Sequence, residues 1–183
     1  MTPADTLKWP HDDVLHAWWV QPGLLAGEYP GASALLKTRL KLNLLLNAGV
    51  RTFIDLTHPT DGLTRYDGVL AELAKDRGIE VTHYRHPIID NWVTSNRGYD
   101  RILERIDTEA AAGRTTYVHC WGGKGRTSTV VGCLLANEGM SYDEVIARIA
   151  ALRAGTRKVS EPCPQDISQH RLLKQRCRPG RRR

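Results

Sequence analysis

Short apolar runs alternate along the chain with longer segments in which apolar residues recur at helical spacing. Four runs rich in β-forming residues are predicted as strands, at residues 24–27, 50–56, 79–85 and 115–119. The helical segments between them end near glycines, at Gly49, Gly78 and Gly113. Strands that alternate with helices predict a single α/β domain with a central, mostly parallel sheet flanked by helices.

The C-terminal half is predicted to be mainly helical. A glycine-rich loop at 122–125 leads into a segment whose apolar residues 130, 131, 134 and 135 share one helical face. Ser141 and Glu144 form a capping box that predicts the start of the next helix, and a last helix is expected at 166–176. We divide the chain into an N-terminal extension (1–18), a domain (19–175) and a basic C-terminal tail (176–183).

Composition and charge narrow the class of protein only slightly. The 183 residues are 41% hydrophobic, and no apolar run approaches the roughly 20 residues of a membrane helix. Without a signal-peptide pattern, a cytoplasmic location is expected. The four cysteines contain no C-x-x-C pair, which argues against a structural zinc site. The net charge of +6 favours an anionic partner or substrate. Much of this charge lies in the arginine-rich tail, which we interpret as a solvated terminus in preference to a contact with nucleic acid or a membrane.

The candidate chemistry lies in residues 119–128, where the last predicted strand runs through a glycine-rich loop into a helix. Cys120 at this position is expected to be a thiolate nucleophile, because a helix N-terminus supplies positive potential. The glycines let successive backbone N–H groups converge on one anion, and Arg126 offers a planar fork for two phosphate oxygens. A hydroxyl at Thr127 can donate to the sulfur. The alternative for Cys120 is an inert buried thiol.

The motif H-C-x5-R-T in this segment resembles the phosphate-binding signature of the protein-tyrosine and dual-specificity phosphatase superfamily. Three further segments are similar to small bacterial dual-specificity-like phosphatases: LLAGEYP at 24–30, FIDLT at 53–57 and PIID at 87–90. So is the stretch 164–173, and the resemblance extends over about 19–174. One departure is Ser128, where the family usually has glycine. The resemblance implies a single protein-tyrosine-phosphatase-like domain.

The resemblance also implies roles for the loop. Phosphate binding is expected from Arg126 and from the loop residues Trp121, Gly122, Gly123, Lys124 and Gly125. His119 is implied to order the loop and favour the thiolate, although a core histidine at a strand end is the alternative. Cys133 is predicted to be a core residue. A redox partnership of Cys163 or Cys177 with Cys120 stays open.

A phosphoryl-transfer site also needs a general acid to protonate the leaving group. The candidates are Asp55, Asp61, Asp90 and Asp100. We favour Asp90, because it follows a strand in a loop that resembles the family's acid loop; the alternative is a turn residue. Gln169 resembles a family glutamine that orients the hydrolytic water, with a solvated helix glutamine as the alternative.

These residues predict a hydrolase that cleaves phosphomonoesters through a phosphocysteine intermediate and needs no cofactor or metal. The expected partners are phosphorylated proteins (phosphotyrosine, phosphoserine or phosphothreonine) or phosphorylated inositols or lipids, with no membrane span and nucleic acid unexpected. Lys124 is similar to a lysine in the loop of a phosphoinositide phosphatase that reads a second phosphate, which favours multiply charged substrates; solvent exposure is the alternative. The competing functions are a non-catalytic phosphate-binding module, a rhodanese-type sulfurtransferase and an RNA 5′-phosphatase.

Overall fold

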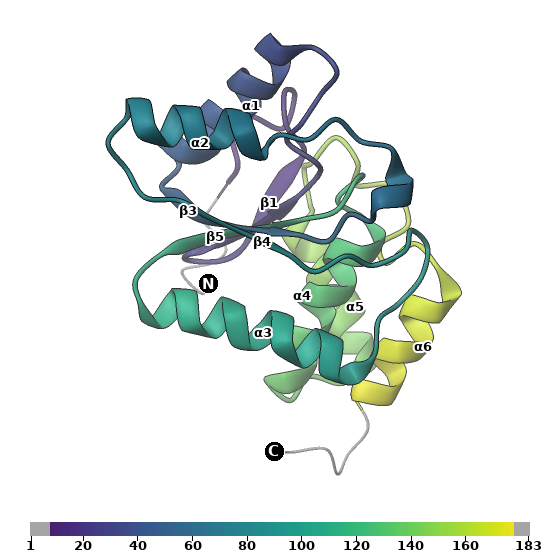
Figure 1. The fold of residues 1–183 in the computed structure, drawn as a ribbon. Helices are drawn as coiled ribbons and strands as arrows, with labels where there is room; N and C mark the ends of the chain where they lie inside the picture. Colours follow the sequence, from purple (N-terminus) through teal and green to yellow (C-terminus); the bar gives the residue numbers. More distant parts are fainter. Residues whose placement is uncertain (1–7, 178–183) are drawn as a thin grey trace.

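The computed structural model describes residues 8–177, which form one sheet with helices on both faces (Figure 1). The strands are β1 (Ala17–Gln21), β2 (Leu24–Gly27), β3 (Val50–Asp55), β4 (Thr82–Arg85) and β5 (Thr115–His119). The helices are α1 (Leu35–Asn47), the short 3₁₀ helix η2 (Pro59–Asp61), α2 (Asp67–Asp76), α3 (Asn96–Ala111), α4 (Gly125–Asn137), α5 (Tyr142–Leu152) and α6 (Ile167–Arg176).

The sheet has the strand order β1-β2-β5-β3-β4. The pairs β2–β5, β3–β5 and β3–β4 are parallel, and only β1 runs antiparallel to its neighbour β2. This confirms the predicted α/β class with a mostly parallel sheet. The central strand β5 therefore lies between β2 and β3, and its carboxyl end is surrounded by the ends of both neighbours.

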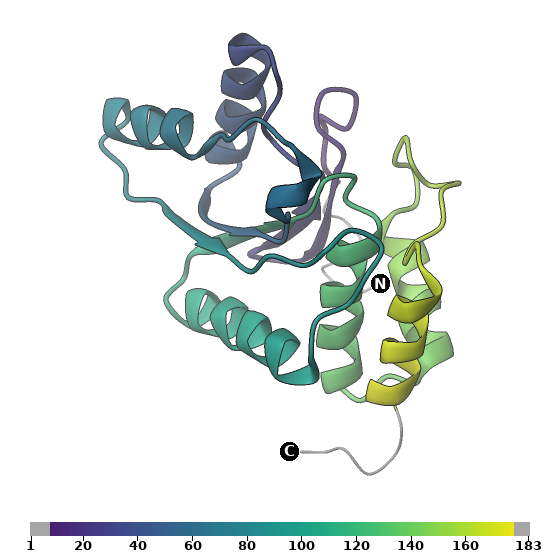
Figure 2. The ribbon, with the colours of Figure 1, turned by 45° about the vertical axis from the view of Figure 1, so that its right-hand side comes forward.

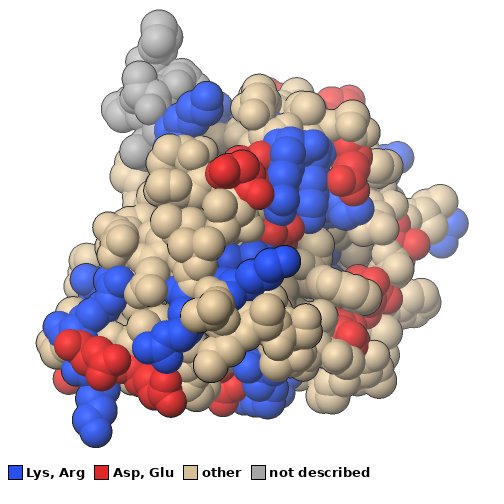
Figure 3. Space-filling model, turned by 90° about the horizontal axis from the view of Figure 1, so that it is seen from above, with Lys and Arg blue, Asp and Glu red and all other residues tan. Residues whose placement is uncertain are grey.

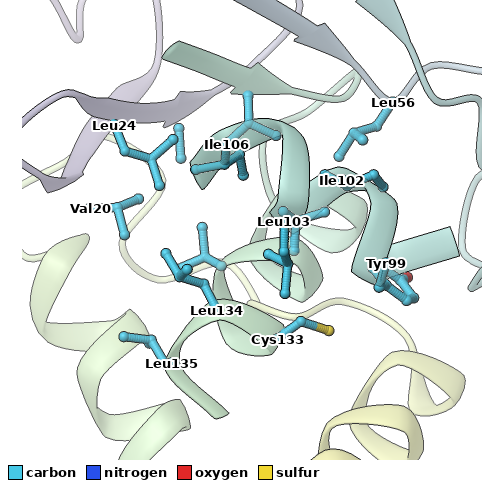
Figure 4. Close-up of a cluster of buried hydrophobic side chains, with 14 of the residues drawn as sticks. Val20, Leu24, Leu56, Tyr99, Ile102, Leu103, Ile106, Cys133, Leu134 and Leu135 are labelled. Carbon is cyan, nitrogen blue, oxygen red and sulfur yellow. The ribbon is translucent and has the colours of Figure 1, made fainter. Parts of the chain in front are cut away.

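Two hydrophobic clusters fill the two faces of the sheet. Helices α1 and α2 cover one face, and helices α3 to α6 cover the other (Figures 1 and 2). Figure 4 shows the second cluster, to which Ile102, Leu103 and Ile106 of α3 and Leu134 of α4 contribute. Cys133 belongs to this cluster, and burial raises the pKa of its thiol to about 12, which confirms its predicted place in the core.

The N-terminal segment contributes to the core on the other side. Trp9 and Leu15, which the sequence analysis places in an extension, are buried, and the Trp9 indole donates a hydrogen bond to the Leu15 carbonyl at 2.7 Å. Strand β1 spans the boundary expected between residues 18 and 19. At the other end, the described chain stops at residue 177, so most of the predicted basic tail lies outside the described residues.

Helix α1 departs from a simple amphipathic pattern. Its buried residues include Leu42, Leu45 and Leu46, while Leu35 and Leu36 near its start are exposed. The leucine spacing thus predicts the helix, but not the part of it that packs on the sheet. Among the described residues, no helix is long and apolar enough to cross a membrane.

Candidate active site

The loop at residues 120–124 connects the end of β5 to the start of α4. Cys120 is buried, with 2% of its surface exposed. Gly123 has a φ of 71°, and a Cβ added there would lie 2.6 Å from the carbonyl carbon of Gly27 at the end of β2. A glycine is therefore required both by the backbone conformation and by the close approach of β2. The backbone N–H of Tyr29 donates to the Trp121 carbonyl at 2.9 Å, which fastens the loop to the segment after β2.

Arg126 lies in the first turn of α4 and is almost completely buried. Its Nη1 donates to the carboxylate of Asp61 at 2.7 Å and to the Ile88 carbonyl at 2.9 Å. Its Nε is a buried atom with no hydrogen-bond partner among the described residues, and its Nη2 lies 3.0 Å from Oδ1 of Asp90. Burial alone would lower the pKa of this guanidinium, but the negative charges of Cys120, Asp61 and Asp90 raise it. The cation is thus held by Asp61 and the Ile88 carbonyl through Nη1, while its Nε donor stays available for an anion.

Two carboxylates meet at Arg126, and their surroundings differ. Asp61 belongs to η2, and its side chain is 3% exposed. Its Oδ2 also accepts a hydrogen bond from the backbone of His58 at 3.2 Å, which fixes the carboxylate further. Asp90 lies in the loop between β4 and α3, with Oδ1 3.0 Å from Arg126 Nη2 and a side chain 45% exposed. Of the two, Asp90 has the surface access that a proton donor to a bound leaving group needs.

The other two acid candidates are engaged elsewhere. Asp55 is buried at the end of β3, where Oδ1 accepts from both the backbone N–H and the hydroxyl of Thr57. Burial would raise the pKa of Asp55, but its contacts with His83 and Thr57 hold this pKa well below the usual range. Asp100 in α3 forms an ion pair with Arg176 at 2.7 Å. Both placements agree with structural roles.

His119 at the end of β5 is fully buried beneath the loop. Its Nε2 lies 2.7 Å from the hydroxyl of Tyr66, at the start of α2. Burial lowers the pKa of His119 to about 4, so its imidazole is neutral at pH 7. A neutral ring with a fixed hydrogen bond on one nitrogen has a defined orientation, which suits the loop-ordering role that the resemblance implies. Nothing in the sequence around Tyr66 signals this contact, which joins residues 53 positions apart.

Thr127 and Gln169 make contacts that the sequence analysis does not anticipate. The Thr127 hydroxyl, predicted to donate to the sulfur of Cys120, donates to the Gly27 carbonyl at 3.3 Å. The Gln169 amide oxygen accepts from the backbone N–H groups of Gln165 and Asp166 at the start of α6. Its Nε2 donates to the Trp92 carbonyl at 3.4 Å, so Gln169 links α6 to the loop that carries Asp90. The roles predicted for both side chains in catalysis stay predictions.

Lys124 and Trp121 occupy the rim of the loop. The Trp121 side chain is 52% exposed. Lys124 forms an ion pair with Glu161, from the segment between α5 and α6. The sulfur of Cys163, two residues later, donates to the Lys124 carbonyl at 3.3 Å. The segment that follows α5 therefore lies against the loop at residues 120–124, a contact that no local motif in residues 153–161 signals.

Comparisons with known proteins identify the family to which the chain belongs. The family model of the DSP-PTPase phosphatase domain of the Swiss Army Knife proteins matches residues 16–175. Phosphatidylglycerophosphate phosphatase PTPMT1 of Arabidopsis thaliana is 31% identical over 80 residues, which are 38% of this chain and 24% of that protein. Triple specificity protein phosphatase PtpB of Mycobacterium tuberculosis is 40% identical over 53 residues, 29% of this chain and 19% of that protein. The chain thus spans less than half the length of these curated relatives.

Solved structures show the same fold. The active form of Tk-PTP superposes with a TM-score of 0.66 at 22% identity, covering 93% of this chain and 98% of that one. PTPMT1 in complex with PI(5)P superposes with a TM-score of 0.65 at 21% identity, covering 88% and 94%. With the family model matching most of its length, the chain belongs to the DSP-PTPase phosphatase domain family of the Swiss Army Knife proteins.

Proposed function

We propose that the protein hydrolyses phosphomonoesters through a phosphocysteine intermediate. The observation that carries the proposal is the guanidinium of Arg126, which is buried, interacts electrostatically with Cys120, and has an Nε unpartnered among the described residues and an Nη2 that faces the half-exposed Asp90. The guanidinium and the backbone N–H groups at the start of α4 can together donate hydrogen bonds to the equatorial oxygens of a phosphoryl group. Asp90, 3.0 Å from the same guanidinium, lies within reach of a leaving group.

The proposed reaction has two steps. In the first, the thiolate of Cys120 forms a bond to phosphorus while the bond from phosphorus to the ester oxygen breaks, and protonated Asp90 gives its proton to that oxygen. In the second, water attacks the phosphocysteine, Asp90 accepts a proton from the water, and inorganic phosphate leaves with regeneration of the thiolate. Arg126 and the loop amides stabilise the charge on the transferred group in both steps.

We propose phosphorylated inositols or phosphoproteins as the substrate class. The relatives carry names of both kinds, since PTPMT1 is described in complex with PI(5)P and PtpB is called a triple specificity protein phosphatase. The position of Lys124 on the rim, 19% exposed, supports substrates with more than one phosphate. The cytoplasmic location stays a prediction.

The test is hydrolysis of para-nitrophenyl phosphate, set against sulfur transfer from thiosulfate to cyanide. A cysteine phosphatase releases nitrophenol without added metal and leaves thiosulfate intact. Thiocyanate production would instead indicate a rhodanese-type sulfurtransferase. Tight binding of vanadate without any turnover would indicate a non-catalytic phosphate-binding module. Comparison of inositol phosphates, a phosphotyrosine peptide and a 5′-phosphorylated RNA would then rank the substrates.

A further inference from the structure

The ion pair between Lys124 and Glu161 lies at the outer rim of the loop at residues 120–124, which we call the phosphate loop because we propose that it binds the scissile phosphate. The Lys124 side chain is 19% exposed and that of Glu161 is 41% exposed, so the carboxylate is the more accessible partner. The lysine stem lies along the loop, since a Cβ added to Gly122 would approach the Lys124 Cε to 3.3 Å. The ammonium group is thereby held beside the loop that we propose binds the scissile phosphate.

A second lysine contacts the same loop from the segment after α5. Lys158 Nζ donates to the Gly122 carbonyl at 2.9 Å and forms an ion pair with Glu28 at 2.8 Å. The pKa of Glu161 is lowered by its hydrogen bond to Lys124 and by the charge of Lys158. The Glu161 carboxylate thus lies in the positive field of two lysines.

The backbone that carries Glu161 is firmly held. Arg153 is 3% exposed, and its guanidinium donates to the carbonyls of Glu161 at 3.2 Å and Lys158 at 2.5 Å. Glu28, itself mostly buried, holds Arg157 at 2.6 Å as well as Lys158. Movement of the Glu161 side chain alone would therefore leave Lys158 in place, because Gly122 and Glu28 hold it. Figure 3 shows one face of the molecule, on which basic and acidic side chains lie beside one another.

We propose that the Glu161 carboxylate, paired with Lys124, occupies the position of a second substrate phosphate at the rim of the loop, and that such a phosphate displaces it on binding. The inference rests on the proposed phosphatase function and deepens it. Glu161 would set how strongly the enzyme prefers multiply phosphorylated small molecules, and the expected class is phosphorylated inositols. A half-exposed ion pair contributes only about 0–1 kcal/mol. A phosphate group, with up to two negative charges and three acceptor oxygens, competes well against a single carboxylate for the same cations.

The test compares Glu161→Gln with Glu138→Gln, a control that removes the same charge from the exposed end of α4, far along the helix from the loop. Each protein is assayed on inositol 1,4-bisphosphate and on para-nitrophenyl phosphate. We expect Glu161→Gln to raise the ratio of kcat/KM for the bisphosphate over the aryl phosphate by about two- to fivefold, the range of one surface ion pair. The control should leave this ratio unchanged. Adding Lys124→Ala to Glu161→Gln should remove the gain, because the second phosphate loses its cation.

An unchanged ratio, or an equal rise in Glu138→Gln, overturns the inference while leaving the phosphatase function intact. Calorimetric titration of inositol 1,4-bisphosphate into Cys120→Ser protein, with and without Glu161→Gln, gives the same test without turnover. If wild-type protein hydrolyses neither substrate, the proposed function fails, and the titration still decides whether Glu161 competes with a phosphate. Glu161→Ala, with thermal melting as a check on folding, guards against an effect peculiar to glutamine.

Discussion

The phosphate loop and the loop that carries Asp90 meet at Arg126, but they are held in different ways. The phosphate loop is buried and enclosed: Cys120 is 2% exposed, His119 and Thr127 are fully buried, and β2 approaches Gly123 closely enough to exclude a side chain. The Asp90 loop lies at the surface, where Ile89 is 56% and Trp92 is 59% exposed. One loop thus has the packing that fixes geometry, and the other has few buried contacts to restrain it.

This difference matches two different demands of phosphoryl transfer. Donors that stabilise charge work best when they are fixed in advance, because no reorganisation is needed as the charge develops. A general acid must instead approach a leaving group that varies with the substrate. Past the buried Ile88, the Asp90 loop is attached through the ion pair of Asp90 with Arg126 and through a long hydrogen bond of 3.4 Å from Gln169 Nε2 to the Trp92 carbonyl. The predictions below test whether the two loops divide the chemistry in this way.

The largest effect is expected at the nucleophile. Cys120→Ser should abolish turnover of para-nitrophenyl phosphate, because a serine hydroxyl at this site lacks a base to ionise it. Binding of vanadate should persist, since Arg126 and the loop amides remain. Fluorescence or calorimetric titration with vanadate measures the second point. Near-wild-type turnover by the serine variant, with metal excluded by a chelator, would rule out the cysteine mechanism.

The next effect tests the exposed loop. Asp90→Asn should lower kcat by about 10²–10⁴-fold for alkyl phosphates, whose leaving groups need a proton. The loss should shrink for aryl phosphates with acidic leaving groups. Asp61→Asn is the matched comparison, because it changes the other carboxylate at Arg126. If Asp61→Asn shows this dependence on the leaving group and Asp90→Asn does not, the assignment of the acid is reversed.

The sequence predicts best the features that local chemistry determines. Strand β5, the glycine loop and α4 are contiguous, so their motif defines the site, and the capping box of Ser141 and Glu144 is observed at α5. Contacts between residues far apart in the sequence have no local sequence motif that predicts them. Glu161 and Lys124 are 37 residues apart, and Tyr66 and His119 are 53 apart.

Strand β1 is a second element that the local sequence pattern does not predict. Its sequence AWWVQ is largely buried on both faces and lacks the alternation that marks a half-buried strand. A short run of this kind is ambiguous by periodicity alone. Pairing with β2 decides its structure, and this pairing is not visible in the pattern of the segment itself.

His119 lies buried under the phosphate loop in its neutral form, so the free energy of unfolding should depend on pH. The pKa of His119 is about 4 in the folded protein against 6.5 ordinarily, so between these values only the unfolded chain takes up the proton. Stability should therefore fall as the pH drops from about 6.5 to about 4, by roughly 3 kcal/mol from this residue. Urea unfolding of wild type and His119→Asn across this range measures the difference. Parallel pH profiles of the two proteins would contradict it.

The smallest effect tests how closely β2 encloses the phosphate loop. Gly123→Ala should destabilise the protein by about 1–3 kcal/mol, through a positive φ and a clash with Gly27, and should lower kcat by displacing the loop amides. Gly113→Ala is the control, because Gly113 has a nearly equal φ of 69° with open space around its Cβ position. Urea unfolding should show a lower free energy of unfolding in both variants, because both gain backbone strain, and a larger decrease in Gly123→Ala. Only Gly123→Ala should also lose activity. Equal costs and unchanged activity would mean that the loop has room beside β2, and the contrast with the Asp90 loop would then lose its structural basis.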